Sequence, residues 1–264
     1  MKSNLSIYHN RMKNHIIPLF ITLAKRDIFG KYRRATMGSL YAIIQPLGYM
    51  LTFLLLSKVV GLTSGGIPYV IMLLTGLVPW LFFSNAITCF ASIIQVNSDL
   101  IKKMPVTREV FILEGLMTSF FDFIISSLIL FLFTIWFHIP FSISLIWLPV
   151  IILILFLIMI GLGFFVAVLG AIRTDLQFLL PFLLQLWMFA SPVIYPLSQV
   201  PESMRWIYSI NPMTGIIDSY RMVIAYGINP DPLLLGISLF FGIILVLLGW
   251  PFFRYYGQYF ADVI

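Results

Sequence analysis

The sequence predicts an all-α integral membrane protein with six transmembrane helices, arranged as a single domain over residues 1–264. Three observations predict this fold class: the composition, the length of the apolar segments and the distribution of basic residues. Hydrophobic residues make up 61% of the chain and charged residues 10%. Soluble domains are about 45–50% apolar and about 25% charged. The composition therefore excludes an ordinary soluble protein.

Six apolar segments are long enough to cross a bilayer, because about 20 helical residues cover the roughly 30 Å of hydrocarbon. They lie at residues 41–60, 67–95, 111–137, 145–170, 178–197 and 233–253. Continuous apolar segments of this length are typical of helices. The strands of a membrane barrel are shorter, about ten residues, and alternate between apolar and polar residues. We expect residues 41–253 to form one six-span bundle.

Basic residues are distributed unequally between the two sides of this bundle. If the N-terminus is cytoplasmic, 13 of the 16 Lys and Arg residues lie on the cytoplasmic side, and only Lys58, Arg205 and Arg221 lie outside. Because cytoplasmic loops carry the excess of basic residues, both termini are predicted to be inside. We expect residues 1–40 to form a cytoplasmic and interfacial N-terminus without a cleavable signal peptide, and residues 254–264 a cytoplasmic tail.

Charged residues on the cytoplasmic side allow two interpretations. The stretch "KRDIFGKYRR" at 25–34 can anchor the chain at anionic lipid, or form an interfacial helix that also contacts a partner. The loop "NSDLIKKMPVTREV" at 97–110 can be a topology signal, or a short helix that docks into a groove of a soluble subunit. Pro105 would limit that helix to the preceding residues. The loop "IRTDLQ" at 172–177 can supply a second contact.

Few polar features lie inside the predicted spans. Asp122 is near the middle of the third span, and Thr118 and Ser126 lie one turn away on the same face, which favours a structural carboxyl over a proton relay. A relay normally requires several ionisable groups. Gly163, Ala167 and Ala171 form a ridge of small residues that predicts close helix packing within or between chains.

The segment 191–227 between the last two spans is amphipathic and contains several prolines. Pro192 and Pro196 break the preceding apolar helix. Two short helices are predicted to follow, at 201–210 and 212–226. The second has Asn211-Pro212 as its start signal and ends at Gly227. Its apolar positions recur at helical spacing, with Asp218 and Arg221 on another face for water or sugar. Such helices either lie on the outer membrane surface or re-enter the membrane to line an exit.

Catalytic and nucleotide-binding motifs are not visible in the sequence. His9, His15 and His138 are scattered, so no metal-ligand spacing or nucleophile–base pair can be identified. The pattern G-x-x-x-x-G-K-[ST] of a phosphate loop is absent. We therefore expect a transport protein rather than an enzyme, with no cofactor and no nucleic-acid partner, whose energy comes from a partner subunit or a gradient.

The order of several motifs resembles that of the type-2 ABC exporter permeases, which move lipid-linked O-antigen, capsule or teichoic acid chains. The motifs are "KYRRATMGSLYAIIQPL", "LLTGLVPWLFFSNAI", "NSDLIKKMPVTREV", "RTDLQFLLPFLLQLWMFASPVIYP" and "NPMTGIIDSYR". The resemblance implies a homodimer with two cytoplasmic ABC ATPase subunits, which would hold the ATP and Mg²⁺. Family members commonly carry "FPR" where this chain has "MPVTR", so Pro105 matches and Arg108 is displaced.

The resemblance also implies roles for particular residues. ATPase coupling is expected at Asp99, Lys102, Lys103, Pro105, Arg173 and Asp175. An extracytoplasmic gate is expected at Ser191, Pro192, Tyr195, Pro196, Trp206 and Ile217. A conduit in which aromatic rings stack on sugars is expected at Tyr49, Phe53, Trp80, Phe83, Trp187 and Phe189.

We therefore interpret the chain as the permease subunit of an ATP-driven exporter in the bacterial inner membrane. Its substrate would be an undecaprenyl-linked polysaccharide, with O-antigen favoured among the family's substrates. Membrane lipid would surround the subunit. The alternatives are a capsule or teichoic acid exporter subunit of the same family, or an ion-coupled secondary carrier. A carrier would require several intramembrane ionisable groups, of which this chain offers Asp122 and little else.

Overall fold

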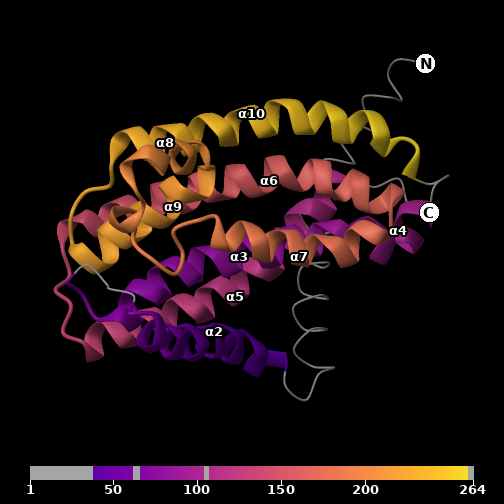
Figure 1. The fold of residues 1–264 in the computed structure, drawn as a ribbon. Helices are drawn as coiled ribbons and strands as arrows, with labels where there is room; N and C mark the ends of the chain where they lie inside the picture. The colour runs from indigo at the N-terminus through magenta and orange to yellow at the C-terminus, as the bar shows by residue number, and fades with distance from the viewer. Residues whose placement is uncertain (1–37, 62–65, 104–106, 261–264) are drawn as a thin grey trace.

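The structure, a computed structural model, describes residues 38–61, 66–103 and 107–260, in which every regular element is a helix (Figure 1). The prediction of an all-helical fold is confirmed for these ranges. The predicted interfacial helix at 25–34 and Pro105 lie outside them.

Five helical segments are long and apolar enough to cross a membrane. They are α2 (Gly38–Val60), α3 (Tyr69–Val96), α5 (Glu109–Trp136), the continuous pair η1 (Ile143–Trp147) and α6 (Leu148–Ile172), and α10 (Pro232–Gly257). Each corresponds to one of the six predicted spans, because a long apolar sequence is sufficient to specify a membrane helix.

The predicted fifth span corresponds to a shorter helix, α7 (Asp175–Phe189), of 15 residues. At 1.5 Å per residue this helix is about 22 Å long, less than the roughly 30 Å hydrocarbon core. The prediction that the helix continues to residue 197 is wrong. Pro192 has no N–H to donate and disfavours helical backbone at Ser191, so the helix ends before both residues.

The remaining short elements lie near the two ends of the bundle. They are α4 (Ser98–Lys103), η2 (Leu197–Gln199), α8 (Glu202–Ile210), α9 (Pro212–Arg221) and the π-helical turn η3 (Met222–Tyr226). In Figure 1, α4 and the C-terminal end of α10 lie on the right, and α8 and α9 lie toward the left. We refer to these regions as the α4 end and the α9 end.

Helix α3 lies at the centre of the bundle. It contacts α2, α5, α6, α7 and α9. In the most apolar part of α3, 83% of the residues are buried inside the protein. The corresponding share is 28% for both α2 and α10. A helix that is hydrophobic on every side is stable only when other elements surround it or lipid covers it, and α3 is surrounded by protein.

Glycines allow α6 to approach its neighbours closely. A Cβ atom at Gly163 would lie 2.6 Å from the ring of Phe90, and one at Gly170 would overlap the carbonyl oxygen of Ala91, both on α3. On another side of α6, a Cβ atom at Gly161 would lie 2.6 Å from Leu245 of α10. The ridge of small residues predicted on α6 therefore packs within the chain, as small residues do at membrane helix interfaces.

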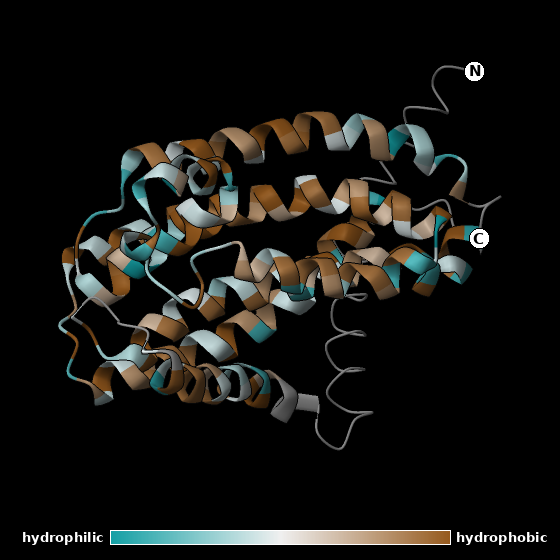
Figure 2. Cartoon of the chain, in the orientation of Figure 1, coloured by the Kyte–Doolittle hydropathy of each residue, from teal (hydrophilic) through white to brown (hydrophobic). Residues whose placement is uncertain are grey.

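The outer helices are rich in hydrophobic residues, which Figure 2 colours brown, and many of these residues are exposed. Leu55, Leu132 and Leu247, on three different helices, are each 65% exposed. Such exposure would be unfavourable in water, but lipid chains are as apolar as leucine. This exterior is typical of a multi-pass membrane protein.

We predict that Gly170→Ala destabilises the chain, because the new Cβ atom would overlap the Ala91 carbonyl oxygen. Overpacking of this kind destabilises by about 1–3 kcal/mol. Gly48→Ala is the matched control, since no atom lies within 4 Å of a Cβ atom at that position. Thermal unfolding in detergent should show a lower midpoint for Gly170→Ala only. Equal midpoints for the two variants would contradict the close approach of α3 and α6.

Candidate functional site

Arg221, at the C-terminal end of α9, is buried and donates hydrogen bonds to four main-chain carbonyl oxygens. Its Nη2 lies 2.8 Å from Pro192 O and 3.1 Å from Val193 O. The same atom lies 3.4 Å from Met72 O on α3, and Nη1 lies 3.4 Å from Tyr195 O. Only 1% of the residue is exposed. We call this set of contacts the arginine anchor.

The anchor supplies donors to a segment that lacks helical hydrogen bonds. Residues 191–196, which we call the proline turn, connect α7 to η2. A buried carbonyl without a partner costs about 1–3 kcal/mol, and irregular backbone at membrane depth occurs only where protein or water satisfies it. Arg221 satisfies three carbonyls of the proline turn and thereby stabilises the break after α7.

The proline turn lies directly against α3 at Gly76. A Cβ atom at Gly76 would overlap the carbonyl oxygen of Val193 and lie 2.9 Å from Nη2 of Arg221. Glycine is therefore required at this position for the turn and the guanidinium to reach α3 together.

Asn211 connects the end of α7 to the start of α9. Its Oδ1 accepts hydrogen bonds from the Met213 amide at 3.1 Å and from the Trp187 indole N–H at 3.2 Å. Its Nδ2 donates to Ser191 Oγ at 2.8 Å. The Asn-Pro start signal predicted for this helix is confirmed, since Asn211 is its N-cap and Pro212 its first residue.

Burial changes the acid–base properties of the anchor. Removal from water lowers the pKa of Arg221 to about 10, and the nearby Asp218 opposes this shift. Burial likewise raises the pKa of Asp218, and Arg221 opposes that shift. Arg221 remains a cation at neutral pH, because its lowered pKa is still well above 7.

The expectation that Asp218 and Arg221 form a face toward water or sugar is wrong for Arg221, and α9 is not a surface helix. Residues 213–221 of α9 are all buried, with Ile217 at 0% exposure. Helix α8 has no buried residue, and its Trp206 is 63% exposed. Helical periodicity cannot reveal this difference, because the partners of Arg221 are carbonyls distant in sequence.

The proline turn also contacts the surface helix α8. The hydroxyl groups of Tyr195 and Tyr208 are 2.7 Å apart, and the Tyr195 hydroxyl donates to Phe189 O at 2.9 Å. Of the predicted gate residues, Ser191, Pro192 and Pro196 are buried in the turn. The turn is thus held between α8 on one side and the arginine anchor on the other.

Aromatic residues predicted to stack on sugar rings form two groups, each of which includes a residue of α7. They are Tyr49, Phe53, Trp80, Phe83, Trp187 and Phe189. Phe189 meets Phe53 edge to face with ring centroids 6.3 Å apart, and Phe53 stacks on Tyr49. Trp187 contacts Phe83 at 5.2 Å and Trp80 at 6.2 Å. Phe83 is 0% and Trp80 2% exposed, whereas Phe189 is 44% exposed. Their role toward sugars remains a prediction.

The two predicted coupling segments are connected through Gln95 at the α4 end. Gln177 Nε2, near the start of α7, donates to Gln95 Oε1 at 2.6 Å. Gln95 Nε2 donates in turn to Gly170 O at 3.1 Å, near the end of α6. Helix α4 begins two residues after the end of α3, because the Asn97 carbonyl accepts from the amides of Leu100 and Ile101. The ends of α3, α6 and α7 are therefore joined.

Most of the predicted coupling residues are exposed at this end. They are Asp99, Lys102, Arg173 and Asp175. Lys103 is the last residue of α4, but its side chain, like Pro105, lies outside the described part of the chain. Charged side chains that point outward can contact a soluble partner without any change in the bundle.

Within the described ranges, no group of three or more His, Cys, Asp or Glu side chains could hold a metal ion.

Comparison with known proteins decides the family. The family model described as "ABC-2 type transporter" matches residues 18–225 of this chain. The chain belongs to the ABC-2 type transporter family. The match includes the whole segment from α2 through the arginine anchor, whereas α10 lies outside it.

Similar curated proteins are also transporter subunits. The O-antigen export system permease protein RfbA of Myxococcus xanthus is 31% identical over 217 residues, covering 81% of this chain and 82% of that protein. An RfbA protein of Klebsiella pneumoniae is 25% identical over 253 residues, covering 95% and 96%. The polysialic acid transport protein KpsM of Escherichia coli is 27% identical over 237 residues, covering 87% and 88%.

Several residues of this ABC-2 transporter were not identified from the sequence. Arg221 was assigned to a polar face toward water or sugar, and Asn211 only to the start of a helix. Gln95 and Gln177 were given no role. The available signal was a cation within a strongly apolar region, which is stable only if buried partners satisfy it. The identity of those partners depends on the tertiary structure.

We predict that Arg221→Met destabilises the α9 end, because four carbonyl oxygens lose their donor. The loss should exceed about 3 kcal/mol, given about 1–3 kcal/mol for each buried group left unpaired. Arg221→Lys should recover part of this loss, since one ammonium cannot reproduce the fork of a guanidinium. Arg205→Met is the control, because that side chain is 44% exposed. Unfolding midpoints in detergent measure the effect, and an unchanged midpoint for Arg221→Met would disprove the anchor.

Proposed function

We propose that this chain is the membrane-spanning permease subunit of an ATP-driven exporter for a lipid-linked polysaccharide. The observation that carries this proposal is the likeness over nearly the whole chain to O-antigen export permeases, within the ABC-2 family. O-antigen linked to undecaprenyl is the favoured substrate. The chain itself acts in transport and not in ATP hydrolysis.

A capsular polysaccharide is the second candidate substrate. The likeness to the polysialic acid transport protein KpsM of Escherichia coli favours it. Both candidates are long, hydrophilic glycans, so both require the same kind of transmembrane passage. An ion-coupled carrier is disfavoured, because the chain belongs to an ABC transporter family, whose members are driven by ATP rather than by an ion gradient.

The proposed topology has six spans, both termini in the cytoplasm and the α9 end outside the inner membrane. Helix α7 would be the fifth crossing, extended through the membrane by the proline turn. The short length of α7 supports a locally irregular crossing, since the arginine anchor satisfies the backbone beyond Phe189. The excess of basic residues on the α4 side supports the orientation.

The proposed partners are a second copy of this chain and two cytoplasmic ABC ATPase subunits that bind ATP and Mg²⁺. Helix α4 and the turn at 173–175 would contact the ATPase, since their charged side chains are exposed at one end. The hydrogen bonds of Gln95 would pass a displacement of these contacts to α6 and α7. A rigid-body shift of packed helices is a common form of such a transition.

The proposed conduit follows the aromatic groups on α2, α3 and α7, and the proposed gate is the proline turn with α8. Trp80 and Phe83 would become available to sugar rings only when α7 moves away from α3, since Trp187 now covers them. Movement of the gate would separate Tyr195 from Tyr208 while the arginine anchor holds the turn on α3.

The topology can be tested by cysteine labelling. In a background without Cys89, single cysteines replace Lys102, His138, Arg173 or Glu202, which are all exposed. An impermeant thiol reagent added to the outside of the inner membrane should label positions 138 and 202 only. Labelling at position 102 or 173 would overturn the proposed orientation.

Coupling and export can be tested together in cells that lack the chromosomal gene. The wild-type chain should restore surface polysaccharide. Replacing Asp99, Lys102 and Lys103 together by Ala should abolish export and weaken copurification of the ATPase, although Ala favours helix and α4 should still form. Lys58→Ala removes an exposed charge at the other end and is the control. Normal export by the triple variant would show that α4 has no coupling role.

A further inference from the structure

A polar pocket of about 370 Å³ lies at the α9 end, between η2, α8, α9 and the start of α10. Four charged side chains from α8, α9 and the start of α10 line it: Arg205, Asp218, Arg221 and Asp231. Apolar side chains that include Leu197 and Ile228 complete the wall. Ligand sites are typically concave and apolar, with a few convergent polar groups and volumes of about 300–1,000 Å³.

Asp218 is a hydrogen-bond acceptor without a donor in this pocket. The residue is only 7% exposed, and within the described part of the chain its carboxylate receives no hydrogen bond. Its electrostatic neighbours are Arg221 and Asp231. A carboxylate that faces a pocket can accept hydrogen bonds from a ligand that enters it.

The other charged groups of the pocket are held in fixed positions. Asp231 Oδ1 accepts from the Leu233 amide at 2.8 Å at the start of α10, which leaves its second oxygen available. The Arg221 guanidinium is directed at main-chain carbonyls. The pocket therefore offers mainly acceptors, which suit a ligand rich in hydroxyl donors.

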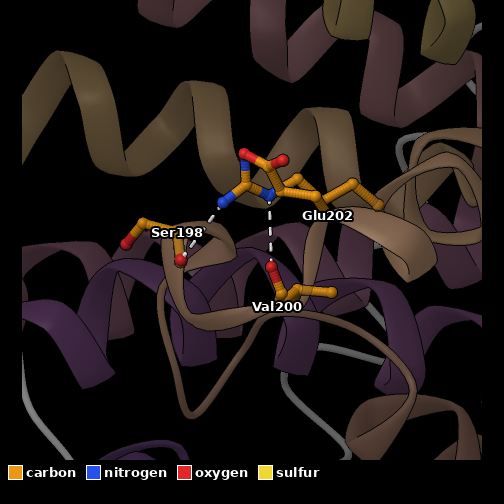
Figure 3. A network of polar contacts seen from close by, with 4 residues as sticks. Ser198, Val200 and Glu202 are labelled. Carbon is orange, nitrogen blue, oxygen red and sulfur yellow. Dashed lines mark hydrogen bonds and ion pairs between the residues drawn. The ribbon is translucent and has the colours of Figure 1, made fainter.

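Arg205 supplies the donor side of the pocket. Its contacts are with Ser198, Val200 and Glu202, which Figure 3 labels. Its Nε donates to Val200 O at 3.1 Å and its Nη2 to Ser198 O at 3.4 Å, while Nη1 lies 3.5 Å from Glu202 Oε1. These contacts fix the guanidinium between η2 and α8. With 44% of the side chain exposed, the guanidinium can still donate to a ligand.

The charges of the pocket argue for a neutral ligand. Two carboxylates and two guanidiniums line it, so a cation would meet two positive groups and an anion two negative groups. A neutral polyol can donate to Asp218 and Asp231, accept from Arg205 and place its C–H face on Leu197 or Ile228. Hydrogen bonds with a charged partner are about twice as strong as neutral ones.

We propose that this pocket is a saccharide-binding subsite that takes a neutral sugar unit of the exported glycan at the α9 end. The inference rests on the proposed function, and it adds a site distinct from the aromatic groups on α2, α3 and α7. Asp218 and Asp231 bind hydroxyl groups, and Arg205 binds a hydroxyl or ring oxygen. A sugar held there would contact α8 and α10 after leaving the membrane.

Site-specific photo-crosslinking in exporting cells tests the subsite, with the cell's own surface polysaccharide as the probe. Benzoylphenylalanine replaces Ile228, which lines the pocket and is 53% exposed. Leu233, 69% exposed and outside the lining, is the negative control. Phe189 reports on the proposed conduit. Glycan attached to the permease is detected by periodate oxidation and hydrazide labelling.

We expect glycan adducts at positions 228 and 189 and none at 233. An adduct at 189 alone would overturn the subsite and leave the proposed function intact. No adduct at any position would contradict both. Equal adducts at 228 and 233 would show unspecific contact and also overturn the subsite.

A variant of the pocket provides the second measurement. Asp218→Asn, in the chain with the crosslinker at 228, should reduce the adduct about tenfold, the loss expected for one charge-assisted hydrogen bond. Lys58→Ala, which removes an exposed charge outside the lining, is the control and should leave the adduct unchanged. The amount of each variant in the membrane is measured by immunoblot. An unchanged adduct in Asp218→Asn at equal protein amount would overturn the proposal.

Discussion

The break after the apolar helix α7 leaves main-chain carbonyls without helical donors, and the guanidinium of Arg221 donates hydrogen bonds to three of them. The same side chain also reaches Met72 O on the central helix α3. One cation therefore fixes the end of α7, the burial of α9 and the contact of both with α3. Gly76 is part of this arrangement, because any side chain there would occupy the space of the turn.

Helix α3 connects the two regions to which function is assigned. Met72 and Gly76, near its start, contact the arginine anchor and the proline turn, and Gln95, near its end, holds α6 and α7. Because α3 is surrounded by protein and packs on the glycines of α6, its position depends on both neighbours. A displacement imposed at the α4 end would reach the α9 end through α3, which continues from one region to the other without an intervening loop.

Polar groups at the α9 end serve two different purposes. Those of Arg221 and Asn211 are used within the protein, where they compensate for irregular backbone. Those of Asp218 and Arg205 line a pocket and retain capacity for an external partner. An exporter of a hydrophilic chain through an apolar bundle needs both kinds, since the backbone of the passage must be stable and the moving chain needs partners for its hydroxyl groups.

The sequence by itself determined the helical class, five long membrane helices, the position of α4 and the starts of α8 and α9, because these depend on local apolar length and on caps such as Asn211 and Pro212. It did not determine where α7 ends or which way α9 faces. Those features depend on contacts between Arg221, Pro192 and Met72, residues far apart in the chain. Helical periodicity reports which residues share a face, whereas only the tertiary structure shows what that face meets. For Arg221 it meets carbonyl oxygens inside the protein rather than water.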